Sequence, residues 1–414
     1  MRLEVVNTGT ELLLGQVVNT HVAYFGDQLI PLGIRIQRQT TIPDGDAIGA
    51  LLKEVFPRAD VVLITGGLGP TSDDVTREVI AELLNRELHL DPALVENIRQ
   101  IFARFGRTMP ESNSRQAMVP DGAVVLENPF GTAPGLYFPA KEGHHPHLFV
   151  LPGPPRELKP MFQNSVLPRL EAMVADTGRV TTYRNLRVIG VGESQLAEVL
   201  EPALLEIGGM EIGYCARLGE VDVRVIGPVD RLDLAESLVR GHFPDQFVNS
   251  DGRSLEETLV NLLTERGLWL STAESCTGGL IASKVTDVPG SSAAFRQGYV
   301  TYANESKSSL LGVPEAMLAE HGAVSEPVAV AMAEGCLRAA GTDYAIAVTG
   351  IAGPGGGSKT KPVGTVFIAV ASRGADTFVK RHQFSMERLA FKERTARMAL
   401  EFVRRMILGL DPWA

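Results

Sequence analysis

Short apolar runs that alternate with amphipathic helical stretches constrain the fold of this chain most. The run Ala59–Ile64 ends in the glycine-rich segment Thr65–Thr71, and apolar residues in Val75–Leu84 then recur at helical spacing. A later run, Leu148–Leu151, ends in Pro152–Pro155. Buried strands that alternate with helices favour an α/β domain with a doubly wound parallel sheet.

The length of 414 residues indicates two or three domains rather than one core. After about Val174 the pattern changes to a small βαββα order, which resembles a KH module. Its last predicted strand, Val221–Ile226, alternates valines with Asp222 and Arg224, which predicts a half-exposed strand. No GxxG loop accompanies Gly190 and Gly192, so we do not expect this module to clamp nucleic acid. We therefore predict three domains: doubly wound over 1–172, small and KH-like over 173–250, and a second α/β domain over 251–414.

The charge balance and the apolar runs restrict the partners. The formal net charge is −10, which makes nucleic acid an unlikely partner. The three cysteines are scattered without a CxxC pair, as expected in a reducing compartment. No signal-like segment and no run of membrane-spanning length is found. We expect a cytoplasmic protein without a membrane contact.

Ser275 is the candidate nucleophile of the third domain. It follows the predicted strand Leu268–Thr272 and precedes a predicted helix near Leu280–Val285, with two glycines between. Backbone N–H groups at such a helix start favour developing negative charge. Since a serine needs a base, Lys307 is a candidate if burial lowers its pKa. The alternatives are that Ser275 only caps the helix, or that Cys276 is the nucleophile.

Two further clusters in the third domain are candidates for substrate contact. The glycine-rich loop that begins at Thr349 and Gly350 includes Gly353, and its N–H groups are suited to an anion. Its spacing is not that of a Walker motif, and a plain flexible connection is the alternative. Gly290 and Ser291 form the second cluster, for which a simple turn is the alternative.

The first domain carries a candidate phosphate site. Gly66, Gly67 and Gly69 lie between a strand and a helix, an arrangement suited to a phosphate or pyrophosphate. Asp73 and Asp74 follow, and they either bind a hard cation such as Mg²⁺ or cap the helix. The histidines at positions 144, 145 and 147 are interpreted as solvated loop residues.

Taken together, these motifs resemble the competence/damage-inducible protein A (CinA) family over essentially the whole chain. The first domain is similar to molybdopterin-binding domains in the stretches Gly9–Leu13, Thr65–Thr71, Asp74–Thr76, Asn128–Gly135 and Leu151–Pro155. The third is similar to a nicotinamide-nucleotide amidase in Thr272–Gly279, Gly290–Ser292, Tyr302 to Lys307, Gly322–Ser325 and Thr349–Pro354.

The resemblance implies two hydrolytic activities. In the third domain Ser275 is the implied nucleophile that deamidates nicotinamide mononucleotide, assisted by Tyr302 and Lys307 and without a cofactor. The expected substrate contacts there are Thr277, Gly278, Gly290, Ser291, Thr349, Gly350 and Gly353. In the first domain the resemblance implies metal-dependent cleavage of ADP-ribose, with Mg, Mn or Co as the cation.

The expected residues of the first site are mainly glycines. They are Gly9, Glu11, Gly66, Gly67, Gly69, Gly131, Gly135, Gly153 and Pro154 for the substrate, and Asp74 and Asp73 for the metal. A homodimer is expected. Two alternatives remain: a first domain that binds a pterin or nucleotide without turnover, and an interaction protein in DNA uptake or recombination.

Overall fold

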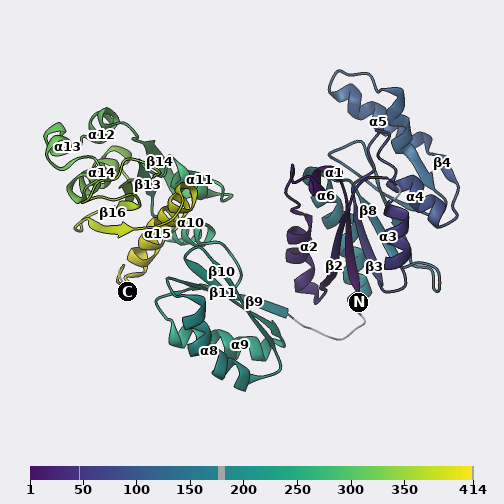
Figure 1. Cartoon of the computed structure of the whole chain (residues 1–414), viewed down its shortest axis with the longest axis horizontal. Coiled ribbons are helices and arrows are strands. Elements are labelled where there is room, and N and C mark those ends of the chain that lie inside the picture. Colours follow the sequence, from purple (N-terminus) through teal and green to yellow (C-terminus); the bar gives the residue numbers. More distant parts are fainter. Residues whose placement is uncertain (46, 176–181, 413–414) are drawn as a thin grey trace. The chain divides into compact units, whose positions relative to one another are not determined.

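The computed structural model describes residues 1–45, 47–175 and 182–412, and the chain divides into two compact units. The first unit is Met1–Thr182 and the second is Tyr183–Ala414 (Figure 1). The second unit contains both the predicted KH-like module and the predicted third domain.

A six-stranded sheet forms the centre of the first unit, in the order β2-β1-β3-β8-β7-β6. The strands are β1 Leu3–Thr8, β2 Ile36–Ile42, β3 Val61–Thr65, β6 Val124–Leu126, β7 Gly135–Phe138 and β8 His147–Leu151. Neighbours among β2, β1, β3 and β8 are parallel, whereas β7 and β6 run antiparallel. The expected parallel sheet is therefore mixed at one edge, since no crossover helix separates β6, β7 and β8.

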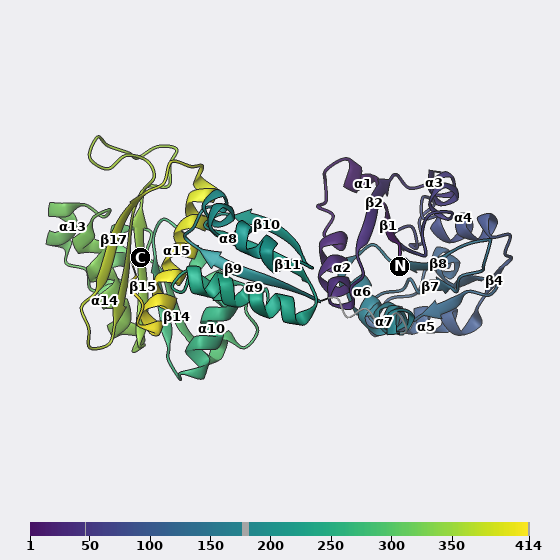
Figure 2. The same cartoon turned by 90° about the horizontal axis from the view of Figure 1, so that it is seen from below.

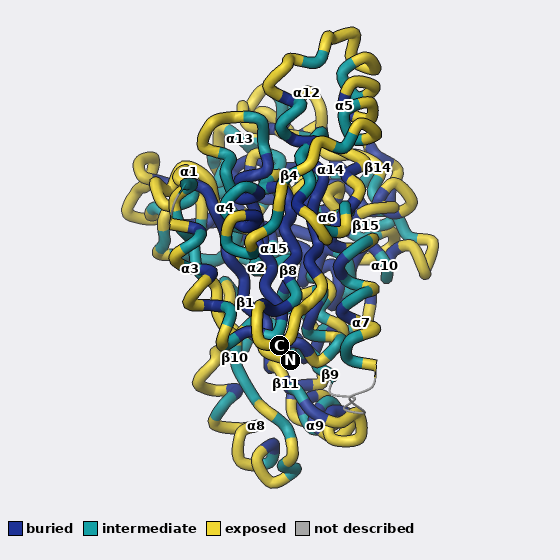
Figure 3. Tube along the Cα trace, turned by 90° about the vertical axis from the view of Figure 1, so that its right-hand side faces the viewer, coloured by how far each residue is buried: buried dark blue, intermediate teal, exposed yellow. Residues whose placement is uncertain are grey.

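Helices cover both faces of this sheet. They are α1 Thr10–Leu13, α2 His21–Leu29, η1 Ile30–Leu32, α3 Ala47–Val55, α4 Thr76–Leu83, α5 Pro92–Arg104, η2 Glu111–Ala117, α6 Pro155–Met161, η3 Phe162–Val166 and α7 Leu167–Ala175. A small ribbon of β4 Leu88–Leu90 and β5 Met118–Pro120 lies outside the main sheet. Alternate residues of β1 and β3 point to two cores, Val5 and Leu63 into one and Val6 and Val62 into the other. These strands are buried throughout (Figure 3).

The second unit begins with a four-stranded sheet in the order β10-β11-β9-β12. Its elements are β9 Thr182–Ile189, α8 Glu193–Ile207, β10 Glu211–Arg217, β11 Glu220–Gly227, α9 Val229–His242 and β12 Phe247–Asn249. The βαββα order is as predicted, and β12 adds an edge strand. Three residues are too few to show a periodicity, so the sequence pattern did not reveal β12.

The half-exposed interpretation of β11 is wrong at Asp222. Its side chain is only 2% exposed, although it alternates with the valines. Two guanidinium groups compensate the buried carboxylate, with Arg187 Nε at 2.8 Å and Arg217 Nη1 at 2.6 Å. A charged residue that alternates with apolar ones in a strand either faces solvent or forms a buried ion pair. The sequence pattern is the same in both cases, so only the fold distinguishes the two.

A five-stranded sheet in the order β14-β13-β15-β16-β17 forms the rest of the second unit. The strands are β13 Leu270–Glu274, β14 Phe295–Val300, β15 Tyr344–Gly350, β16 Thr365–Ser372 and β17 Phe378–Gln383. The helices are α10 Leu255–Glu265, α11 Leu280–Thr286, η4 Ser291–Ala293, α12 Asn304–Leu311, α13 Glu315–His321, α14 Glu326–Ala340 and α15 Arg388–Leu408.

The arrangement of this sheet prepares a site at one of its edges. β14, β13 and β15 are parallel, and β16 and β17 continue the sheet antiparallel. The long helix α15 packs against β15, β16, α10 and α11 (Figure 2). The loops after the three parallel strands meet at one edge, where such folds place their ligands.

Candidate functional sites

The register of three parallel strands brings the loops around Ser275 together. Glu274, the last residue of β13, pairs with Val300 of β14 and Val348 of β15. The N–H of Ser275 donates to Val348 O at 3.1 Å, and the N–H of Thr301 donates to Glu274 O at 2.8 Å. The residues that follow these strands therefore lie side by side at the carboxyl edge of the sheet.

Ser275 and Lys307 form the polar centre of this edge. Lys307 Nζ lies 3.4 Å from Ser275 Oγ, with Lys307 1% exposed and Ser275 9% exposed. The amine also donates to Thr301 O at 2.9 Å and to Tyr302 O at 3.3 Å. Within the described chain it makes no ion pair with a carboxylate, and burial lowers the pKa of Lys307. A buried amine without a counter-ion is prepared to take a proton from the serine hydroxyl.

Cys276 is unsuited to the nucleophilic role that the sequence left open for it. Its side chain is buried, and this burial raises the pKa of the thiol to about 12. A thiol needs to ionise before it attacks, so Cys276 stays protonated near neutral pH. Of the two adjacent candidates, the geometry favours Ser275.

Glu274 fixes the turn that carries Ser275. Its fully buried carboxylate accepts the N–H groups of Gly279, Ile281 and Ala282 at 2.8–3.1 Å. The N–H groups of Ile281 and Ala282 in the first turn of α11, and that of Gly279 before it, are thus already satisfied, which corrects the expectation that the groups at this helix start are free for a developing anion. A carboxylate in this place also opposes a second negative charge there.

The backbone donors of the turn itself are partly used. The N–H of Gly278 donates to Ser275 O at 3.1 Å, so it is not available to an oxyanion as the structure stands. The N–H of Thr277 has no acceptor among the described residues, and the buried hydroxyl of Thr277 has none either. Of the two predicted contacts in this turn, Thr277 retains free donors and Gly278 does not.

Tyr302 takes part through its backbone rather than through its ring. Its carbonyl accepts from Lys307, whereas the side chain is 64% exposed. In the described parts of the chain the Tyr302 hydroxyl makes no hydrogen bond. The expected assisting hydroxyl is therefore not placed on the Ser275–Lys307 pair.

The structure brings some of the other predicted contacts to this edge and separates the rest. Thr349 follows Val348 and donates its hydroxyl to Ala323 O at 2.7 Å. A Cβ at Gly350 would lie 2.7 Å from Thr365 O, so this glycine serves strand packing. The carbonyl of Gly353 accepts from Arg388 at 2.9 Å, which ties the glycine-rich loop to α15.

Gly290 and Ser291 lie at the opposite end of the strands. They precede β14, whose first residue, Phe295, pairs with Leu270 at the beginning of β13. Ser275 follows the other end of β13, five residues after Leu270 or roughly 16 Å along the strand. The register, which the sequence did not show, thus separates Gly290 and Ser291 from Ser275 within one chain, and their predicted contact with the substrate stays a prediction.

Sequence reasoning missed Lys392, near the beginning of α15. Its Nζ lies 3.7 Å from the position that a Cβ on Gly278 would occupy. It forms no ion pair with any described carboxylate, and it is half-buried. More than a hundred residues separate it from Ser275, so no local motif could have revealed it.

A pocket lies at the carboxyl edge of the sheet in the first unit. It has a volume of about 390 Å³. Most of the residues predicted for this site line it: Gly9, Glu11, Gly66, Gly67, Gly69, Asp73, Asp74, Gly153 and Pro154. The residues that sequence reasoning missed include Thr8, Asp44, Gln116 and Glu157.

Two predicted glycines lie outside this pocket. Gly135 belongs to β7, and a Cβ there would lie 2.8 Å from Val150 O and 2.7 Å from Met161 Cε. Its predicted role in substrate binding is therefore replaced by a role in packing. Gly131 lines a neighbouring pocket of about 600 Å³, and it lies against the carboxylate of Glu157.

The charges around the first-unit pocket are all negative. Five carboxylate residues line it, and none of the lining residues is a lysine, arginine or histidine: Glu11, Asp44, Asp73, Asp74 and Glu157. Burial raises the pKa of Glu157. The carboxylate of Asp74 accepts a hydrogen bond from the N–H of Thr71 at 3.0 Å and another from the Thr71 hydroxyl. A polyphosphate needs a cation between itself and such a wall.

These residues fit a magnesium-like cation better than a zinc-like one. Among the described residues no group of three or more His, Cys, Asp or Glu side chains is arranged to hold a metal. Mg²⁺ commonly uses one or two carboxylates, several waters and the phosphates of the substrate. The carboxylates that line the pocket are suited to this way of binding Mg²⁺. One of them, Asp74, also accepts hydrogen bonds from Thr71.

No helix in the described chain combines the length and the apolar character needed to cross a bilayer.

Comparison with known families matches three parts of the chain. The probable molybdopterin binding domain matches residues 4–172, the KH domain of damage-inducible protein CinA matches 183–241, and the CinA C-terminal domain matches 252–407.

Relatives resemble the chain over nearly its full length. A CinA-like protein of Akkermansia muciniphila is 48% identical over 400 residues, which cover 97% of this chain and 96% of the relative. A CinA-like protein of Kosmotoga olearia is 40% identical and covers 99% and 100% of the two chains. Solved structures similar to parts of this chain include competence/damage inducible protein CihA from Agrobacterium tumefaciens, which is 42% identical with a TM-score of 0.36. The match covers 37% of this chain and 96% of that one. The identity over whole chains shows that this protein belongs to the CinA family.

Proposed function

We propose that the second unit deamidates nicotinamide mononucleotide to nicotinate mononucleotide and ammonia. The observation that carries this proposal is the 3.4 Å distance between Ser275 Oγ and the buried Lys307 amine, which pairs with no carboxylate in the described chain. A serine with a desolvated lysine is a known solution to acyl transfer without a histidine. The family resemblance selects the nicotinamide nucleotide among amide substrates.

The reaction begins with attack of Ser275 Oγ on the carboxamide carbon while neutral Lys307 takes the hydroxyl proton. The tetrahedral intermediate then expels the amide nitrogen, to which the Lys307 ammonium returns a proton, and ammonia leaves. Water attacks the resulting ester with Lys307 again as base, and collapse releases the carboxylate and restores the serine hydroxyl. We assign the N–H of Thr277 to the oxyanion, because no acceptor among the described residues occupies it.

Lys392 suits the phosphate of the substrate. Its ammonium is near Gly278 and has no carboxylate partner in the described chain, so it offers an unmatched positive charge near the turn that follows Ser275. A nucleotide monophosphate supplies the matching negative charge. No metal is needed for these steps.

For the first unit we propose cleavage of ADP-ribose with the help of a divalent cation, Mg, Mn or Co. The supporting observation is a pocket that is lined by five carboxylates and by no cationic residue. A bound cation would neutralise the diphosphate and polarise the bond to be broken, with Asp74 and Asp73 as its first candidate ligands and Glu11 as the alternative. Gly153 leaves room for the diphosphate to approach the backbone, since a Cβ there would have its nearest neighbour at 3.8 Å, whereas Gly66 and Gly67 pack closely against Thr8 and Thr76.

The test is to incubate the purified full-length protein separately with the two substrates and to identify the products. Nicotinate mononucleotide and ammonia from the first, and AMP with ribose 5-phosphate from the second, are expected. Ligand binding without any product from ADP-ribose would favour a binding module for the first unit. Salt-sensitive DNA binding would favour the interaction role suggested by the competence names of the relatives.

We further propose that the protein acts in the cytoplasm and as a homodimer. Light scattering coupled to size-exclusion chromatography measures the second point, because a dimer has twice the mass of 44.6 kDa. A monomer at micromolar concentration would contradict it.

A further inference from the structure

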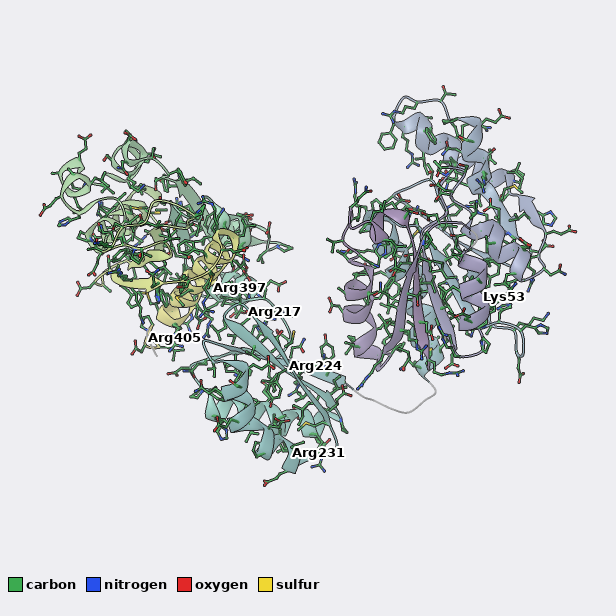
Figure 4. The ribbon with its side chains drawn as sticks, viewed as in Figure 1. Lys53, Arg217, Arg224, Arg231, Arg397 and Arg405 are labelled. Carbon is green, nitrogen blue, oxygen red and sulfur yellow. The ribbon has the colours of Figure 1, made fainter. Side chains whose placement is uncertain are left out.

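A cavity of about 260 Å³ lies inside the second unit, away from Ser275. One wall comes from the KH-like module, where Ile189, Gly190 and Gly219 belong to β9 and to the turn between β10 and β11. The other wall comes from β17 and α15. In Figure 4, Arg397 and Arg405 lie on α15 at the side that meets this module. The cavity is therefore formed by both parts of the unit together.

Among the charged side chains around this cavity, the cationic ones outnumber the carboxylates. Four basic residues line it: Lys380, Arg394, Arg397 and Arg405. Glu220 and Glu401 are the carboxylate residues of the described lining, and each already pairs with an arginine. Arg397 lies 2.6 Å from Glu220, and Arg404 lies 2.7 Å from Glu401. This surplus stands out in a chain whose net charge is −10.

Arg394 is the cation that the protein leaves without compensation. Throughout the described chain it has neither an ion pair nor a hydrogen bond with another residue, although it is half-buried. Burial, and then the charge of Arg397, lowers the pKa of Arg394, and no carboxylate acts in the other direction. Its guanidinium lies directly over Gly219, where a Cβ would be 1.9 Å from Nη1. An uncompensated guanidinium in this position lacks an anion.

The same deficit is seen at neighbouring polar atoms. Arg405 is 3% exposed, and its buried Nη2 has no hydrogen-bond partner; the carboxylates of Glu401 and Asp245 approach its guanidinium only to 3.9 Å and 4.0 Å. The buried Nε2 of His382 also has no partner. Burial, with the charges of Lys380 and Arg394, lowers the pKa of His382 to about 4, so it is neutral near pH 7. A neutral imidazole still donates one hydrogen bond to an anionic oxygen.

The remaining wall is apolar. Leu255, Met398 and Phe402 line it, and the His382 ring stacks on Phe402 with 5.9 Å between centroids. A ligand for this cavity thus needs an anionic end that faces the arginines and a compact body that lies on the apolar side.

We propose that this cavity is a binding site for a small organic anion, a phosphorylated or carboxylated molecule about the size of a pentose phosphate, held chiefly by Arg394 with Arg405 and His382. Phosphate and carboxylate share the acceptor oxygens that guanidinium groups recognise. The site is separate from both proposed catalytic pockets, and it does not depend on the proposed reactions.

The test is calorimetric titration of the full-length protein with ribose 5-phosphate, inorganic phosphate and nicotinate, followed by hydrogen–deuterium exchange. Loss of a charged hydrogen-bond partner should weaken binding about tenfold or more in Arg394→Met. The bound ligand should protect amides of residues 217–220 and 378–384, which belong to the two walls. Tighter binding of ribose 5-phosphate than of nicotinate would identify phosphate as the recognised group, and the reverse order would identify carboxylate.

Arg381→Met is the matched control. It removes the same charge from β17, which forms the same wall of the cavity as α15, but Arg381 is exposed and donates to Thr360 O instead of lining the cavity. If Arg394→Met does not fold, Gly219→Ala retains every charge and displaces the guanidinium from the opposite wall. Equal affinity of the wild type and the folded variants, or protection only at other sites, would overturn the proposal.

Discussion

The two proposed catalytic sites lie at equivalent edges of their sheets but carry opposite charges. In the second unit, the Lys307 amine lies 3.4 Å from Ser275 Oγ and the Lys392 amine lies near Gly278 in the same turn, while the carboxylate of Glu274 is bound to three backbone N–H groups. In the first unit, glycines and five carboxylates line the pocket without a cationic side chain. The same sheet edge thus provides a nucleophile with its base in one case and room for a cation in the other.

This difference shows how one type of fold can hold sites for two chemistries. Amide cleavage needs a nucleophile whose proton has somewhere to go, and a buried lysine accepts it. Cleavage of a diphosphate needs charge neutralisation, and a wall of carboxylates attracts the cation that supplies it. The parallel strands supply the location, whereas the loop residues supply the chemistry.

The largest effect is expected from Ser275→Ala. Without the nucleophile, deamidation of nicotinamide mononucleotide should fall by about 10³-fold or more, because the covalent route is lost. Cleavage of ADP-ribose should not change. Ser283→Ala, an exposed serine on α11, is the control. Ammonia release by Ser275→Ala at the wild-type rate would remove Ser275 from the mechanism.

Chelation tests the opposite side of the comparison. EDTA should lower ADP-ribose cleavage by about 10²-fold or more and leave deamidation unchanged, because only the carboxylate-lined pocket calls for a cation. Asp74→Asn should act in the same direction on the first activity alone, while Asp27→Asn on the exposed side of α2 should have no effect. If Asp74→Asn retains full turnover, Asp74 serves only the turn at Thr71 and the metal ligands are Glu11 or Asp73.

Lys307→Arg separates a base from a positive charge. Guanidinium stays protonated near neutral pH, so the variant should lose about 10²-fold of the deamidation rate. In the wild type the rate should rise with pH as the amine loses its proton, with a midpoint below the ordinary lysine value of 10.5, because burial lowers the pKa of Lys307. A pH profile measured between 6 and about 10 checks this. An active Lys307→Arg enzyme would show that Lys307 only provides charge.

A smaller effect is expected at Glu274, which supports the turn without touching substrate in the proposal. Glu274→Gln keeps one acceptor oxygen for three N–H groups, so the free energy of unfolding should fall by about 2 kcal/mol. The displaced turn should reduce kcat more than it raises KM. Urea denaturation together with steady-state kinetics measures both, and an unchanged variant would mean that the turn is held by other contacts.

The smallest effect distinguishes a packing glycine from a pocket glycine in the first unit. Gly135→Ala should destabilise this unit by about 1–3 kcal/mol, since the new Cβ would meet Val150 O and Met161. Gly153→Ala has its nearest neighbour at 3.8 Å, so it should retain stability and lose affinity for ADP-ribose instead. The midpoint of thermal unfolding and the KM for ADP-ribose are measured for both variants. A stable Gly135→Ala with a raised KM, together with a destabilised Gly153→Ala, would exchange the roles of the two glycines.

Local pattern predicted most elements of both units. The helix expected near Leu280–Val285 is found as α11 Leu280–Thr286, and the runs Ala59–Ile64 and Leu148–Leu151 correspond to β3 and β8. These elements were predictable because burial leaves a periodicity of about 2 or 3.6 residues within a few turns of chain. Elements without enough residues to show a period, such as β12, were not found.

From the amino-acid sequence we could infer the family resemblance, the order of the elements and the residue types at Ser275, Lys307 and Asp74. Only the fold shows which residues meet. It brought Lys392 to Gly278, placed Ser291 at the far end of β13, buried Asp222 between two arginines and left Arg394 without a counter-ion. The physical reason is that strand register and helix packing join residues far apart in the chain, and the charge balance of a site depends on all of its neighbours.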